Sequence, residues 1–177
     1  WGSYFYNPAN DALRFVVKPE TVDFTEWLTY EFVNQTDKSA DLRMRWERKG
    51  ITFLVETDVY ANTVASIEKQ LQGSLGFDTD AHTQAAQYVV QNGNGKDLDK
   101  ALAWADRAIT DQFAGQSNFQ TLSTKAQVLD KMGKADEAKA LMDKALPLGS
   151  ITVVHFYGRS LIASGKNAEA LKIFKWN

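Results

Sequence analysis

The chain has 177 residues, of which 20 are Lys or Arg and 22 are Asp or Glu, so its net charge is −2 at pH 7. This balance lacks the basic excess that binding to nucleic acid or to an anionic membrane requires. The sequence has no cysteine, which excludes disulfides and thiolate chemistry, and no apolar run approaches the roughly 18 residues of a membrane-spanning helix.

Residues 1–58 place apolar side chains at every second position, the period of a strand with one buried and one solvated face. Turn residues separate the segments, so adjacent strands are predicted to be antiparallel. The predicted strands are 13–17, 28–32, 42–46 and 51–55, with 4–6 as a further strand. Because a bare apolar face would aggregate, either the following helices or another sheet must cover it. We expect half of a β-sandwich, with further strands upstream of residue 1.

Three stretches of this region carry a resemblance to a known family: WGSYFYNPANDALRF at 1–15, EWLTYEF at 26–32 and LRMRWE at 42–47. They resemble the second half of a bacterial family catalogued as domain of unknown function 2911. The resemblance implies an exported protein of Bacteroidota, in the periplasm or cell envelope, since family members are mostly exported. It also fits a helical repeat region after the β-domain, which some longer members have. The family's activity is unassigned and its first half has no counterpart here, so the resemblance implies no catalytic residue.

Residues 59–80 are predicted to form a bridging helix and a linker. Asp58 is the predicted N-cap of a helix over 59–72, and Asp80 is the predicted cap of the next helix. Apolar residues with helical spacing mark one face of the first helix: Tyr60, Val64, Ile67 and Leu71.

Residues 81–177 repeat a pattern of Gly-Lys, a short polar link and an alanine that opens an apolar helix face. The alanines are Ala101, Ala138 and Ala170, 37 and 32 residues apart. A helix–turn–helix period near 34 resembles degenerate tetratricopeptide repeats, the alternative being a plain helical bundle. Since the last helix ends with Phe174 and Trp176 still apolar, we expect either further residues or a contact with another chain at this end.

In tetratricopeptide arrays the first helix of each pair lines a concave groove. We therefore hypothesise that polar residues on two such helices bind an extended peptide or an acidic partner; the alternative is a solvated face without a ligand. The candidate residues are Gln120, Ser123, Gln127, Lys131, His155 and Arg159.

Other polar clusters have simpler interpretations. The segment 78–82 (DTDAH) lacks the glycine and the final acidic residue of a calcium-binding loop, and is interpreted as a helix N-terminus. The segment 93–96 (GNGK) lacks phosphate-loop spacing and is interpreted as a turn. No catalytic motif accompanies the two histidines, so no cofactor, metal or catalytic residue is predicted.

The sequence therefore predicts an α+β protein with three regions: an antiparallel β-domain at 1–58, a bridge at 59–80 and a helical repeat domain at 81–177. The leading hypothesis is a non-enzymatic module that binds a protein or peptide. One alternative is an enzyme or a small-ligand or glycan binder, with its site in absent N-terminal strands or at the sheet–helix junction. Another is a purely structural β-domain with the helices as a dimerisation surface. Self-association through the sheet face or the C-terminal end is a separate expectation.

Overall fold

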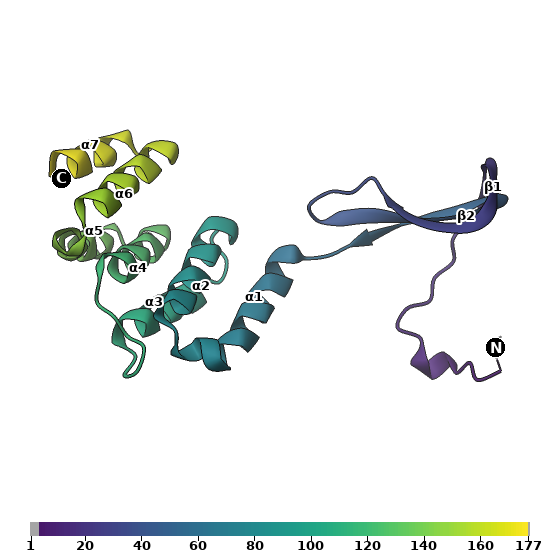
Figure 1. The fold of residues 1–177 in the computed structure, drawn as a ribbon, viewed down its shortest axis with the longest axis horizontal. Coiled ribbons are helices and arrows are strands. Elements are labelled where there is room, and N and C mark those ends of the chain that lie inside the picture. The colour runs from purple at the N-terminus through teal and green to yellow at the C-terminus, as the bar shows by residue number, and fades with distance from the viewer. Residues whose placement is uncertain (1–3, 177) are drawn as a thin grey trace. The chain divides into compact units, whose positions relative to one another are not determined.

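The computed structural model describes residues 4–176 and has the predicted α+β architecture (Figure 1). In these residues a two-stranded antiparallel sheet precedes seven α-helices. The chain divides into two compact units, Trp1–Val59 and Tyr60–Asn177, called here the β-unit and the helical unit. Trp1–Ser3, which open the stretch with the family resemblance, and Asn177, which ends the predicted repeat domain, lie outside the described residues.

The sheet pairs β1 (Glu20–Val33) with β2 (Ser39–Glu56). Tyr30 lies opposite Met44 and Phe32 opposite Leu42, which places these apolar side chains on one face. Glu31 lies opposite Arg43 on the other face, where its carboxylate also pairs with the Arg45 guanidinium at 2.9 Å. The predicted alternation of apolar and polar positions is therefore present in the paired strands.

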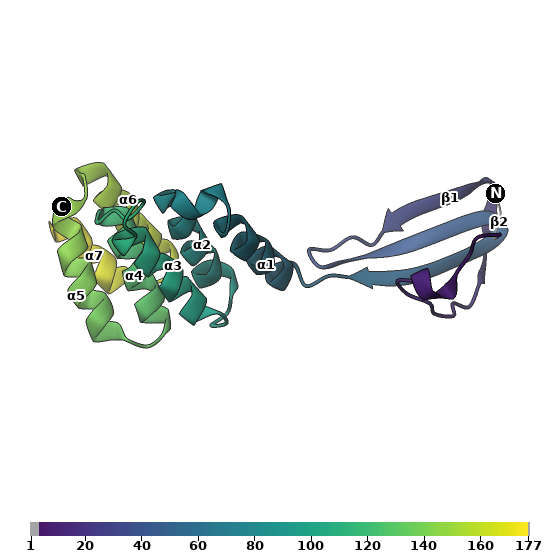
Figure 2. The same ribbon diagram turned by 90° about the horizontal axis from the view of Figure 1, so that it is seen from below.

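β2 doubles back on itself. A straight strand of its 18 residues would span about 60 Å, yet the Thr57 amide donates to the Lys38 carbonyl at 2.9 Å. Glu47, midway between these residues, has a φ of 51°, the left-handed conformation of a tight reversal. Figure 2 shows the two arms of β2 side by side. The segments 42–46 and 51–55, predicted as separate strands, are these two arms.

The segment 13–17 is not a strand, contrary to the prediction. Its Phe15 ring packs edge-on against Phe53, with centroids 5.0 Å apart. Pro19 follows and cannot donate a ladder hydrogen bond. The segment therefore contacts the sheet through the Phe15 ring without pairing with it.

Residues 4–6 are also not a strand, because local side-chain bonds fold this part of the chain into a loop. The Tyr6 hydroxyl donates to Asp11 Oδ2 at 2.8 Å, and the Arg14 guanidinium pairs with the same oxygen at 2.8 Å. Between them lies a short 3₁₀ helix, η1 (Pro8–Asn10), capped by the Asn7 side chain.

The apolar face of the β-unit remains largely exposed. Leu28 is 53 %, Tyr30 62 %, Phe32 58 % and Trp46 56 % accessible. Among the described residues of this unit only Gly50 is buried. The second layer of a β-sandwich thus stays a prediction.

The helical unit consists of consecutive short helices joined by turns, with a longer loop at 111–118 between α3 and α4 (Figure 1). Its elements are α1 (Val59–Leu71), η2 (Ser74–Phe77), α2 (Thr79–Asn92), α3 (Leu98–Thr110), α4 (Phe119–Lys131), α5 (Ala135–Ala145), η3 (Leu146–Leu148), α6 (Ile151–Ala163) and α7 (Asn167–Trp176). None of the helices in the described residues is long and apolar enough to cross a membrane.

Two apolar cores hold these helices together, and α4 contributes to both. The first core joins α1 to α4 and contains Val64, Leu71, Ala85, Ala86, Val89, Ala101, Trp104, Ala105 and Val128. The second joins α4 to α7 and contains Phe119, Leu122, Ala126, Met142, Ala145, Leu146, Val154, Leu161, Ala170 and Ile173. The alanines that marked the sequence repeat, Ala101, Ala138 and Ala170, are all buried, which lets neighbouring helices approach closely.

Two of the predicted Gly-Lys turns have the same geometry. Gly133 and Gly165 have φ values of 80° and 77°, where glycine is favoured because it has no Cβ. The amides of the following residues, Lys134 and Lys166, each donate at 2.9 Å to the carbonyl five positions earlier. This is the bond that closes a Schellman cap at the end of a helix. The tetratricopeptide assignment itself stays a prediction.

Candidate functional site

The first helices of the three predicted pairs, α2, α4 and α6, begin in the same way. Asp78, Asn118 and Ser150 are their N-caps, and each side chain accepts a hydrogen bond from an amide two or three residues later. Such a cap satisfies amides that the helix leaves unpaired. Asp78 rather than Asp80 is therefore the cap of α2, a correction to the prediction, and Asp80 lies in the first turn.

Relative to these caps, the three helices bury side chains at equivalent positions. The fourth, eighth and eleventh residues after each cap are buried and share one side of a helix. They are His82, Ala86 and Val89 in α2; Leu122, Ala126 and Leu129 in α4; and Val154, Gly158 and Leu161 in α6. The second, ninth and thirteenth residues fall on the opposite side and the fifth lies at the border of the buried side. The six predicted site residues occupy these four positions.

The structure exposes four of the six predicted residues: Gln120, Lys131, His155 and Arg159. Gln127 is half-buried. Ser123 is only 3 % accessible, and its hydroxyl donates to the Gln120 carbonyl at 3.1 Å. Ser123 therefore has neither the exposure nor a free proton with which to bind a partner.

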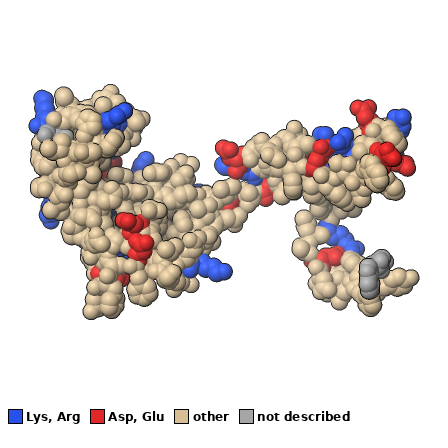
Figure 3. Space-filling model, viewed as in Figure 1, with Lys and Arg blue, Asp and Glu red and all other residues tan. Residues whose placement is uncertain are grey.

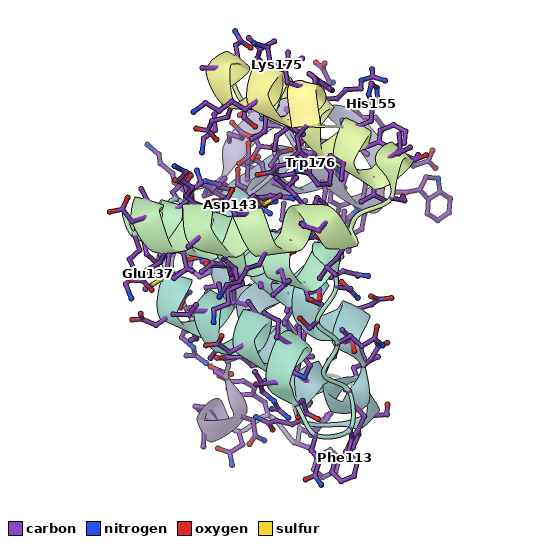
Figure 4. All side chains as sticks on the ribbon, turned by 90° about the vertical axis from the view of Figure 1, so that its left-hand side faces the viewer. Phe113, Glu137, Asp143, His155, Lys175 and Trp176 are labelled. Atoms are coloured by element: carbon purple, nitrogen blue, oxygen red, sulfur yellow. The ribbon has the colours of Figure 1, made fainter. Side chains whose placement is uncertain are left out.

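His155 lies at the surface of α6, next to α7 (Figure 4). Its ring centroid is 5.4 Å from that of Phe174 and 6.2 Å from that of Phe156. Phe174 also fills the space above Gly158, which has no side chain. The aromatic packing thus holds His155 beside the exposed Arg159, one turn further along the helix.

Gln87, on α2, is a residue of this surface that the sequence reasoning missed. It is the ninth residue after its cap, as Gln127 and Arg159 are after theirs. Its side-chain amide donates to the Thr124 hydroxyl at 2.9 Å and so joins α2 to α4. The spacing from the cap residues Asp78, Asn118 and Ser150 identifies Gln87 as the equivalent of Gln127 and Arg159. The spacing from the Gly-Lys turns does not, because the turn after α2 is longer than the turns after α4 and α6.

An ion pair joins α4 to the turn before α7. Lys166 Nζ lies 2.5 Å from Asp130 Oδ2, and this hydrogen bond raises the pKa of the lysine. Lys131, next to Asp130 in the chain, remains exposed. On the face shown in Figure 3, charges of both signs are scattered and neither forms a large patch.

A separate open cleft of about 290 Å³ lies between α1, η2 and α2. It is lined by Ile67, Gln70, Leu71, Leu75, Ala81, Gln84, Ala85 and Tyr88. The lining is apolar apart from two amides and one phenol. Its volume is at the lower limit of sites for small molecules.

The segment 78–82 is built as a helix start. Asp78 accepts hydrogen bonds from the amides of Asp80 and Ala81. The His82 ring is fully buried and its Nε2 lies 3.0 Å from the Gly76 carbonyl, which ties η2 to α2. Within residues 4–176 no three His, Cys, Asp or Glu side chains gather in a way that could hold a metal ion.

Comparison with known proteins identifies only the N-terminal region. No curated protein and no solved structure matches the chain. Residues 1–55 match the model of a family described as a protein of unknown function, DUF2911. The resemblance predicted for residues 1–58 is confirmed over this segment, and the match is consistent with a DUF2911 family segment in the N-terminal third of the chain.

Proposed function

We propose that the helical unit is an interaction module in which α2–α7 form three tetratricopeptide-like helix pairs. The proposal depends on one observation: three capped helices bury the same positions and present polar residues from the opposite side. Stacked helix pairs of this kind create an extended surface for another protein.

The partner we propose is an extended peptide segment with acidic side chains. Lys131 and Arg159 are exposed cations on the proposed surface, and His155 lies one turn from Arg159. The half-buried Gln87 and Gln127 supply amides, which can donate to and accept from a peptide backbone. Export to the cell envelope also stays a proposal, which derives from the family resemblance alone.

The experiment is a screen of an acidic peptide array with the whole chain, followed by charge reversal. Lys131→Glu with Arg159→Glu should weaken every selected peptide more than tenfold, because two attractive contacts become repulsive. The matched control is Lys139→Glu with Lys172→Glu, which changes the net charge equally at exposed positions on α5 and α7. Equal loss of affinity in both variants would refute the assignment of this surface.

The alternative function, an enzyme or a binder of a small ligand or glycan, stays a prediction. Within the described residues, the α1–α2 cleft is the feature that suits a small molecule, and its open lining contains no carboxylate, histidine, lysine or arginine. We therefore favour the interaction module.

A further inference from the structure

β1 has one long edge without a partner. It pairs with β2 along one side over residues 20–33, and no other strand in the described residues pairs with its second side. Along this edge alternate residues direct backbone N–H and C=O groups away from β2. Two carbonyls of β1, those of Asp23 and Trp27, accept hydrogen bonds from the hydroxyls of Thr25 and Thr29. A free edge of this length is a template for another strand.

The edge also lacks lysine and proline, two of the residues that usually prevent such pairing. β1 contains no Lys, Arg, Pro or Gly. Its register irregularities fall before Thr29, so the part from Thr29 to Val33 is regular. The segment 27–33 (WLTYEFV) combines high β-propensity with a single charge, that of Glu31.

We propose that β1 pairs antiparallel with β1 of a second copy of this chain, about a two-fold axis at Tyr30. In this register Tyr30 lies opposite Tyr30 of the second copy, Leu28 opposite its Phe32, and Thr29 opposite its Glu31. The exposed apolar side chains of the two copies then meet on one face of a continuous sheet. Identical patches that contact each other in this way form a closed dimer.

Charge favours this arrangement over parallel stacking of copies. About the axis at Tyr30, Glu26 lies opposite Asn34 and Glu31 opposite Thr29, so no two carboxylates face each other. Parallel in-register pairing would place each Glu31 beside that of its neighbour, which is destabilising. The sequence of β1 is thus compatible with a dimer and unfavourable for an open stack.

The first test measures the mass of the whole chain in solution by light scattering between 1 and 100 µM, a range that spans ordinary dimer affinities. We expect twice the chain mass at the upper concentrations. Tyr30→Lys with Phe32→Lys should raise the dissociation constant more than tenfold, because lysine on an edge strand opposes pairing. Both side chains are more than half exposed, so the helical thermal transition should not change.

The control is Phe77→Lys with Phe113→Lys, which changes two exposed aromatic residues of the helical unit, 69 % and 80 % accessible. Figure 4 shows Phe113 pointing away from the helices. This variant should remain dimeric. A wild-type chain that is monomeric at all concentrations would overturn the proposal, as would a dimer that the β1 variant does not weaken.

The second test determines the register by disulfide formation. The chain has no cysteine, so a single introduced cysteine is the only thiol that can form a disulfide between two copies. Opposed residues in an antiparallel pair have Cα atoms about 4.5–5.5 Å apart, within disulfide range. Tyr30→Cys should therefore cross-link with itself. Leu28→Cys should cross-link only when mixed with Phe32→Cys. Packing of two sheets face to face, about 10 Å apart, would yield none of these bonds and would overturn the proposed pairing.

Discussion

At the scale of single residues, Tyr60 shows how one side chain fixes the start of the helical unit. Its hydroxyl donates to Asp97 Oδ2 at 3.0 Å, and its ring stacks on Tyr88 with centroids 6.0 Å apart. Asp97 has a φ of 54°, so this bond helps to hold a left-handed residue just before α3. Partial burial, followed by the bond to Asp97, raises the pKa of Tyr60 to about 12.

Replacing Tyr60 with Phe should lower the free energy of unfolding by about 0.5–1.5 kcal/mol at pH 8, because the hydrogen bond is lost and the stacked ring is kept. The raised pKa favours the protonated, folded form. Its contribution is fully present below the unfolded pKa near 10 and is lost as the pH rises towards about 12. The difference between wild type and Tyr60→Phe should therefore shrink between pH 10 and 12.

Urea unfolding followed by circular dichroism at pH 8, 10 and 11 would measure this effect. Tyr4→Phe is the control, since Tyr4 is 91 % accessible. It should change neither the stability nor its pH dependence. A Tyr60→Phe variant as stable as wild type at pH 8 would show that the Asp97 bond contributes nothing.

At the scale of elements, the approach of α6 to α7 depends on the absence of a side chain at Gly158. A Cβ at this position would lie 2.7 Å from Phe174 Cε1 and 2.8 Å from its Cζ. Alanine in a helix interior gains about 1 kcal/mol over glycine, whereas overpacking costs about 1–3 kcal/mol. The contact is so close that the cost of overpacking should exceed the gain in helix propensity, and the substitution should lower the free energy of unfolding.

Gly158→Ala should therefore destabilise the chain by about 1 kcal/mol, measured by urea unfolding. Adding Phe174→Leu should relieve the clash, so the double variant should be more stable than the sum of the two single changes. This non-additivity is the diagnostic result. A Gly158→Ala protein that is more stable than wild type would mean that Phe174 moves aside at little cost.

The helix at 59–72 and the expected strand at 13–17 show what sequence periodicity can predict about single elements. The helix expected at 59–72 is α1, Val59–Leu71, because a 3.6-residue period depends only on neighbours in the chain. The period of two at 13–17 indicated a strand, but periodicity does not say whether a pairing partner exists. Ser123 shows the corresponding limit for the candidate site. Its position in the helix was suitable, but its short side chain bonds to its own backbone and is covered.

At the scale of the whole molecule, the buried apolar side chains of residues 4–176 all belong to one unit. Both cores lie within Tyr60–Asn177, whereas the described part of the β-unit buries Gly50 alone. Burial of apolar area is the main favourable term in folding. The stability of the helical unit should therefore come from its own contacts.

We predict that a fragment of residues 60–177 folds alone, with a thermal midpoint within about 3 °C of the helical transition of the whole chain. A loss of about 1 kcal/mol in the free energy of unfolding would lower the thermal midpoint of a unit of this size by more than about 3 °C. Circular dichroism at 222 nm at several concentrations would measure it, and the fragment should show no concentration dependence because it lacks β1. A fragment that melts much earlier would show that the β-unit stabilises the helices. In that case the exposed face of the sheet would have a role within the chain that pairing with a second copy does not explain.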